Sequence, residues 1–135
     1  MMRKKLWLIT LISVLTSFSF LSVAQEEQSS KAPCDKYETT ADMRNCLEQR
    51  YEAADKALNE VYKQLRSKLS KKCQTQLKET QLWWIKFRDL SAAFEASEAE
   101  GGSMYPLVYN SVLRTITEKR VEELKKRLKK MPSEN

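Results

Sequence analysis

Residues 39–69 read TTADMRNCLEQRYEAADKALNEVYKQLRSKL, and apolar side chains recur in this stretch every three or four positions. An α-helix has about 3.6 residues per turn, so this spacing gathers them on one face of a helix of about seven turns. Thr39 with an acid three residues later resembles a capping box, so we expect the helix to begin near Thr40. The apolar face consists of Met43, Leu47, Tyr51, Ala54, Leu58, Val61, Leu65 and Leu69.

No Gly or Pro occurs among the 67 residues from Cys34 to Glu100. A sheet needs a turn residue about every eight to twelve positions, so this stretch favours long helices. The segment Ser70-Lys71-Lys72 is a polar break without a strong stop signal, and we place a second helix from about Thr75 to Glu98. Its apolar face is read as Leu77, Trp84, Phe87, Ser91 and Phe94, widened by Leu82, Ile85 and Ala93.

The second helix is expected to end before Gly101 and Gly102, since paired glycines allow backbone angles that a helix cannot continue through. Pro106 suits the first turn of a third helix, which carries Val112, Leu113, Ile116, Val121, Leu124 and Leu128. Three amphipathic helices with short connections fold back on one another, so the sequence predicts an all-α fold, a small antiparallel bundle of three helices. A chain of 135 residues has room for one domain, which we place at residues 34–131.

The N-terminus reads as a secretory signal peptide at residues 1–24. Basic residues 3–5 precede an uncharged, mostly apolar run at residues 6–23, whose end offers the small residues that a signal peptidase recognises. An uncleaved anchor is the alternative, because a run of 18 residues nearly spans a bilayer. The abrupt change to polar residues favours cleavage after Ala24, which leaves residues 25–33 as a flexible leader. We therefore expect a periplasmic or secreted protein without stable membrane insertion after cleavage.

Composition argues against most enzyme chemistry. The chain has no His, which removes Ser-His-Asp and Cys-His catalysis and most zinc and haem sites. With only two Gly residues, the chain also lacks a loop that could cradle a nucleotide phosphate. We therefore expect a protein that binds a protein partner, catalyses nothing, and holds no metal and no cofactor.

The charge distribution gives little reason to expect nucleic-acid binding. Removing residues 1–24 takes three of the 24 basic residues and none of the 18 acidic ones, so the mature chain carries 21 against 18, a net charge of +3. Much of this excess lies at residues 125–130, without interleaved aromatic side chains. Cations at a helix C-terminus offset the helix dipole, and we favour this role over contact with nucleic acid or acidic lipid.

Three cysteines allow three single bridges, and helix geometry separates them. Cys46 lies in the second turn of the first helix and Cys73 beyond its far end, about 40 Å away along an unbroken helix, which is too far to bridge. Cys34 precedes the helix and can fold back onto Cys46. We therefore expect a Cys34–Cys46 disulfide, with Cys73 free or paired with a second chain.

The residues assembled along the chain resemble the LprI-type domain, a family named for a mycobacterial lysozyme inhibitor. The resemblance runs from about Cys34 to Leu128. It is carried by Met43-Arg44-Asn45-Cys46, Tyr51, Ala54-Asp55, Leu58-Asn59, Tyr62, Gln81, Trp84, Phe87-Arg88-Asp89, the segment 100–104, Thr117 and Arg120. Members of the family usually carry a second disulfide at the positions of Ala92 and Val112. Loss of both halves implies a packed apolar contact there, and second and third helices less constrained than in relatives.

The resemblance implies an exported envelope protein that binds another protein. The founding member inhibits lysozyme, whereas most relatives are uncharacterised proteins of bacterial envelopes. Animal lysozymes are generally basic, so a patch of carboxylates favours their binding, and the best such patch here is Glu95, Glu98 and Glu100. We expect inhibition of a lysozyme or similar muramidase by protein–protein contact. The alternative is a structural or adaptor module that binds another envelope protein.

The loop after the second helix is the other candidate part of the partner-binding surface. The segment Gly101-Gly102-Ser103 lets the backbone approach a partner closely and Tyr105 can anchor the contact, although a plain connector between helices fits the same residues. Trp83 and Trp84 are adjacent, so they point in different directions on a helix. We assign Trp84 to the core and take Trp83 as a candidate exposed anchor.

Six polar residues of the motif form the last candidate cluster, namely Asp55, Asn59, Arg88, Asp89, Thr117 and Arg120. Asp55 and Asn59 are one helical turn apart, as are Thr117 and Arg120. Such a cluster either binds a ligand or fixes the register of the helices through hydrogen bonds and ion pairs. Because neither a nucleophile nor a metal ligand set accompanies these charges, we interpret the cluster as a structural network.

Overall fold

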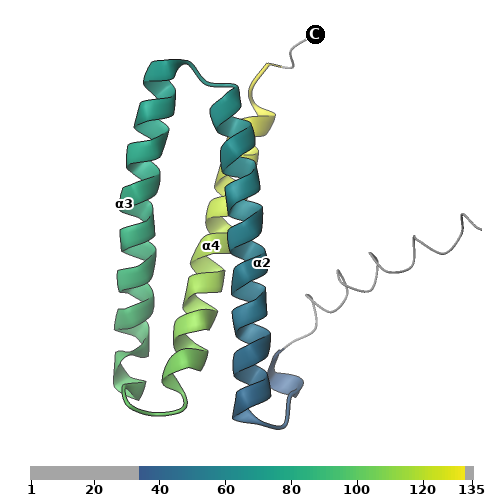
Figure 1. Ribbon diagram of the computed structural model, residues 1–135, viewed down its shortest axis with the longest axis vertical. Coiled ribbons are helices and arrows are strands. Elements are labelled where there is room, and N and C mark those ends of the chain that lie inside the picture. Colours follow the sequence, from purple (N-terminus) through teal and green to yellow (C-terminus); the bar gives the residue numbers. More distant parts are fainter. Residues whose placement is uncertain (1–33, 133–135) are drawn as a thin grey trace, which may run out of the picture. The chain divides into compact units, whose positions relative to one another are not determined.

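The computed structural model describes residues 34–132. They form, in order, η1 (Cys34–Lys36), α2 (Thr40–Ser67), α3 (Lys71–Ala96), η2 (Ser97–Ala99) and α4 (Tyr105–Lys129). No strand occurs in this range, so the predicted all-α arrangement of three helices is confirmed. Helix α3 runs antiparallel to α2 and α4 (Figure 1). The predicted signal peptide and leader lie outside the described residues.

Side-chain caps set the starts of the first two helices. The Thr39 hydroxyl accepts a hydrogen bond from the Asp42 amide at 3.1 Å and donates one to the Asp42 carboxylate at 2.6 Å, so α2 begins at the predicted position. Helix α3 begins at Lys71, four residues before the predicted start, because the Ser70 hydroxyl accepts from the Cys73 amide at 3.4 Å. The segment that reads as a polar break is therefore a helix cap.

The connection between α3 and α4 depends on one glycine. Gly101 has a φ of 77°, a left-handed conformation that favours Gly over residues with a side chain. The Tyr105 amide then donates to the Gly102 carbonyl at 3.2 Å, and Pro106 lies in the first turn of α4. The predicted helix break at the paired glycines is therefore confirmed.

The predicted Cys34–Cys46 disulfide is present, with a Cα–Cα distance of 5.8 Å. It ties η1 to the second turn of α2. Cys73 is a free, half-buried cysteine in the first turn of α3. Within residues 34–132, no helix is both long enough and apolar enough to cross a membrane.

The main core lies between α2 and α4. It consists of Leu58, Val61 and Leu65 on α2 packed against Val121 and Leu124 on α4. Figure 1 shows these two helices running close together, with α3 standing to one side of them. Burying a Val or Leu side chain stabilises a fold by roughly 1.5–3 kcal/mol, so this cluster is a main source of stability.

Helix α3 faces the bundle with small and polar residues as well as with Leu77 and Trp84, which pack against the core as predicted, so the predicted apolar face is corrected in part. Its buried residues are Gln81, Arg88, Ala92 and Ala96. Phe87 and Phe94, predicted to face the core, are 61% and 75% exposed. The reason is that α3 carries apolar residues on two opposite sides. Fully buried Ala92 and Ala96 let α3 approach its neighbour closely, which two Phe side chains at the contact would prevent.

Candidate functional site

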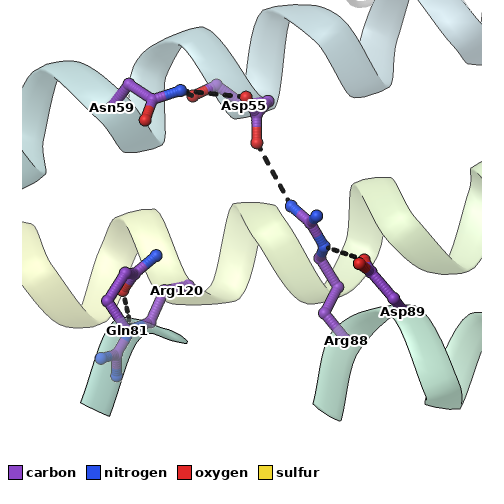
Figure 2. Close-up of polar contacts among 6 residues, drawn as sticks. All are labelled: Asp55, Asn59, Gln81, Arg88, Asp89 and Arg120. Carbon is purple, nitrogen blue, oxygen red and sulfur yellow. Dashed lines mark hydrogen bonds and ion pairs between the residues drawn. The ribbon is translucent and has the colours of Figure 1, made fainter. Parts of the chain in front are cut away.

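Arg88 is the centre of a polar cluster between α2 and α3. Its Nη1 lies 3.2 Å from the Oδ1 of Asp55 on α2, and its Nε lies 2.9 Å from the Oδ1 of Asp89 (Figure 2). The guanidinium carbon is also 5.4 Å from the centroid of the Tyr51 ring and 5.3 Å from that of Trp84. Arg88 is buried, so both carboxylates and both rings contribute to holding a charge inside the bundle.

The two oxygens of the Asp55 carboxylate have different partners. Oδ1 accepts from Arg88, while Oδ2 accepts from the Asn59 side-chain amide at 2.9 Å (Figure 2). The same amide donates to the Asp55 backbone carbonyl at 2.9 Å. Asn59, one helical turn further along α2, therefore fixes the Asp55 rotamer. In this rotamer the Asp55 carboxylate pairs with the Arg88 guanidinium.

Burial and charge act against each other at Arg88. Burial is the largest single influence and lowers its pKa, but hydrogen bonds to Asp89 and Asp55 and the nearby charges outweigh burial and raise the pKa above its ordinary value. Burial raises the pKa of Tyr51, with the Arg88 charge opposing it. The cluster therefore contains a permanent cation beside a neutral phenol, and neither is an activated nucleophile or base.

A second cluster surrounds Arg120 on α4. Its Nε donates to the Gln81 Oε1 at 3.3 Å (Figure 2), and its Nη1 lies 3.0 Å from the Glu123 Oε2. The Arg120 guanidinium carbon is 5.8 Å from the centroid of the Trp84 ring, and the Arg88 guanidinium also lies over this ring. The Trp84 ring therefore joins the two clusters, because it contacts Arg88 of α3 and Arg120 of α4.

The six polar residues predicted as one network are divided by the structure. Asp55, Asn59, Arg88 and Asp89 form the first cluster, and Arg120 belongs to the second. Thr117 is fully buried, but its Oγ1 has no hydrogen-bond partner among the described residues. Gln81, which links α3 to α4, was absent from the predicted network, although it belongs to the motif.

The predicted partner-binding residues lie at the opposite end of α3 from Cys73. Glu95, Glu98 and Glu100 are exposed, and within residues 34–132 none of them forms an ion pair. The glycine turn with Ser103 follows directly and is exposed as well. Tyr105 is half-buried and stacks on Tyr109, with ring centroids 5.8 Å apart. We call Glu95, Glu98 and Glu100 the acidic end of α3, although Glu98 lies in η2 and Glu100 in the turn that follows it.

Trp83 lies elsewhere, on the outer side of α3. It is 69% exposed, and the Lys86 ammonium lies 4.7 Å from the centroid of its ring. Phe87, Leu90 and Phe94 lie on the same side at spacings of four, three and four residues. We call these four residues the α3 outer ridge. The regular spacing is visible in the sequence, but it overlaps the pattern from which the inward face was predicted.

The arrangement offers exposed surfaces on a scaffold held by polar contacts. Among the described residues, no group of three or more His, Cys, Asp or Glu side chains is placed to hold a metal ion. A groove of about 470 Å³ runs beside the first cluster, lined by Tyr51, Glu52, Asp55, Lys56, Asn59, Glu60 and Lys63. Its only contact with the cluster's charges is the edge of Asp55, whose side chain is 39% exposed.

Comparison with known proteins supports the resemblance seen in the motifs. The family model described as lysozyme inhibitor LprI matches residues 31–124. An uncharacterised protein of Rhizobium meliloti (strain 1021) is 31% identical over 111 residues, covering 73% of this chain and 80% of the relative. No solved structure matches this chain. The family match spans both polar clusters, the glycine turn and most of the three helices, and the chain belongs to the lysozyme inhibitor LprI family.

Proposed function

We propose that this protein is an exported inhibitor that binds a lysozyme or similar muramidase through the acidic end of α3. The observation that carries the proposal is the set of exposed carboxylates Glu95, Glu98 and Glu100, which have no ion-pair partner in the described part of the chain. Free carboxylates within six residues attract a basic protein and speed its association. Membership of the lysozyme inhibitor LprI family supports the choice of partner.

The turn that follows these carboxylates suits a binding surface. Gly101 holds a positive φ, and an added Cβ would meet no atom within 4 Å there, so the backbone is open on that side. The residues directly after the turn begin α4, in whose first turns Tyr105 stacks on Tyr109. Rigid helices on both sides reduce the conformational entropy that the turn would lose on binding.

In this proposal the two polar clusters hold α3 in place and take no part in chemistry. Arg88 joins α3 to Asp55 on α2, and Gln81 joins α3 to Arg120 on α4. Glu95 lies on the same helix, and Glu98 and Glu100 follow it directly in η2 and the turn, so their positions depend on both links. The protein therefore acts by binding to its partner and blocking the partner's cleft, without catalysis, cofactor or metal.

Export is the second part of the proposal. The Cys34–Cys46 disulfide fits an oxidising compartment, and the basic and then apolar residues 1–24 fit a cleaved signal peptide. Both support a mature protein in the periplasm or outside the cell, where it would encounter a lysozyme that attacks the cell wall.

Lysis of a cell-wall suspension by lysozyme tests the proposal. The purified protein should slow lysis, and the triple variant Glu95→Gln/Glu98→Gln/Glu100→Gln should lose at least about tenfold in inhibition, because the attracting charges are gone. The matched control is Glu48→Gln/Glu52→Gln/Glu60→Gln, which changes the net charge equally at exposed positions on α2 and should inhibit almost normally.

Two results would count against this function. If the wild-type protein leaves lysis unchanged in molar excess over several lysozymes and muramidases, the adaptor alternative, in which another envelope protein is the target, is the better one. If both triple variants lose inhibition equally, net charge rather than the acidic end of α3 carries the binding.

A further inference from the structure

The α3 outer ridge is an apolar surface that no other part of residues 34–132 covers. Trp83, Phe87, Leu90 and Phe94 are 69%, 61%, 71% and 75% exposed. They lie opposite the buried side of α3, which carries Gln81, Arg88, Ala92 and Ala96. Neither α2 nor α4 can cover the ridge, because both lie on the other side of α3.

The size of the ridge indicates an interface. An aromatic side chain presents about 150–250 Å², so the ridge exposes roughly 400–600 Å² of mostly apolar area. This is as large as the largest patch on a typical monomer, about 300–600 Å², and such patches mark binding sites. Two ridges together supply roughly 800–1,200 Å², which approaches the about 1,200–2,000 Å² of a standard interface before flanking residues are added.

We propose that the ridge binds a second copy of this chain, with the two α3 helices antiparallel. The spacing of four, three and four residues reads the same in both directions along the helix. A two-fold axis between positions 88 and 89 therefore sets Trp83 against the partner's Phe94, and Phe87 against the partner's Leu90. Such spacing is that of a two-heptad coiled-coil seam, and a two-fold interface requires a surface that is complementary to itself.

The charges around the ridge are compatible with this pairing. The next seam positions at its two ends are Thr80 and Ser97, which are neutral and would face each other across the interface. Lys86 is the charged residue nearest the middle, and its ammonium already lies over its own Trp83 ring. The same axis sets Lys86 against the partner's Ser91, so no like charges meet in the middle of the seam. Glu79 and the partner's Glu98 face each other only at its two ends.

The pairing does not depend on lysozyme binding. It assigns Trp83 to the contact between chains, whereas Glu95, Glu98 and Glu100 lie beside one end of the seam and are not among its four ridge residues. Antiparallel pairing places the two acidic ends at opposite ends of the dimer, so each can take a partner separately. Failure of the lysis assay would leave the dimer untouched, and failure of the dimer would leave the acidic end untouched.

Sedimentation equilibrium tests the dimer. The sample is the protein expressed from the full-length gene and purified after any signal-peptide cleavage by the cell. We expect the mass of two chains at high concentration, and Leu90→Glu should raise the dimer dissociation constant at least about tenfold by placing two carboxylates in the seam. Tyr37→Glu is the matched control, because Tyr37 is 45% exposed but lies outside α3, and it should leave the dissociation constant unchanged. Circular dichroism should show the same helix content for both variants.

A cross-linking experiment tests the orientation without altering the ridge. Thr80→Cys with Ser97→Cys, in a Cys73→Ser background, should form a covalent dimer under mild oxidation. The two positions are about 25 Å apart within one helix, so they cannot bridge inside a chain. Each single cysteine variant should form no covalent dimer, because position 80 of one copy faces position 97 of the other copy.

Three outcomes overturn the proposal. The first is a monomer at every concentration, even if the ridge then captures a different protein. The second is a dimer that Leu90→Glu leaves intact. The third is efficient cross-linking of the Thr80→Cys variant alone, which would require parallel helices.

Discussion

Arg88 shows how one side chain serves two helices. Its guanidinium pairs with Asp55 on α2 and Asp89 on α3, and lies over the rings of Tyr51 and Trp84. Within residues 34–132 it provides the one ion pair that joins α2 to α3. A residue of this kind sets helix register, whereas apolar contacts alone tolerate slippage.

Replacing Arg88 should destabilise the fold. Breaking a buried ion pair costs about 3–5 kcal/mol, and because Asp55 is 39% exposed we expect Arg88→Ala to lie near or below the lower end of that range. Thermal unfolding followed by circular dichroism measures the effect, with Lys86→Ala on the outer side of α3 as the control. An unchanged melting temperature combined with lost partner binding would instead make the cluster a binding site.

Thr117 is the opposite case, a buried polar residue whose hydroxyl makes no hydrogen bond within the described residues. Its Oγ1 has no hydrogen-bond partner in the described structure, although the residue is fully buried. Thr117→Val keeps the shape and removes the unsatisfied hydroxyl, so we expect a gain of about 1 kcal/mol or more in the free energy of unfolding. Thr115→Val on the exposed side should not stabilise, since that hydroxyl bonds to the Ser111 carbonyl. Loss of stability in Thr117→Val would reveal a partner for the hydroxyl.

At the scale of the helices, α2 could be predicted closely and α3 only in part. The apolar residues of α2 follow one stripe, and Leu58, Val61 and Leu65 are buried as predicted. In α3 the apolar residues occupy two sides, and hydrophobic periodicity cannot say which side faces inward. The choice is made by Arg88, which must reach Asp55, and by Ala92 and Ala96, whose small size permits close packing. Such reasons lie in tertiary contacts, which no local pattern contains.

The inward side of α3 should tolerate no added bulk. Ala92 is fully buried, so Ala92→Leu forces side chains or backbone to shift and should cost about 1–3 kcal/mol. Ala53→Leu is the control, because Ala53 lies on an exposed side of α2 and the substitution should be nearly neutral there. Chemical denaturation of both variants measures the difference. Equal stability would mean that α3 packs with a different side against the bundle.

For the candidate site, the sequence identified most residues but not their grouping. Asp55, Asn59, Arg88 and Asp89 meet as predicted, because helical spacing places the first two on one face of α2. The separation of Arg120 and the isolation of Thr117 depend on how α4 is rotated about its axis. The outer ridge is not recognisable from the sequence as one surface, because the pattern assigns Phe87 and Phe94 to the core face and only Trp83 to the exposed side.

At the largest scale, residues 34–132 form a close pair of helices, α2 and α4, with α3 attached at their side (Figure 1). Helix α3 carries the acidic end and the outer ridge, and so offers both proposed binding surfaces. The α2–α4 pair supplies the core on which α3 is mounted. Support and recognition are therefore largely divided between different helices.

One measurement on the whole exported chain tests processing and disulfide pairing together. Cleavage after Ala24 predicts an intact mass that lacks residues 1–24, and the Cys34–Cys46 bridge predicts one free thiol per chain in denaturant, from Cys73. Mass spectrometry of protein from the periplasm, with and without a thiol reagent, determines both. A mass that retains residues 1–24 would indicate a membrane anchor, and three reactive thiols would contradict the bridge.

The partnership of α2 with α4 also constrains when the chain can fold during synthesis. Leu58, Val61 and Leu65 leave the ribosome early, but Val121 and Leu124 emerge only when translation is nearly complete. Contacts between residues so distant in sequence form late. The apolar face of α2 therefore stays unpacked until α4 has been synthesised. This delay would serve the proposed export, because a chain must stay unfolded to pass through a narrow secretion channel. A messenger truncated before the codon for Val121 would instead yield a polypeptide without its core, which proteases would remove.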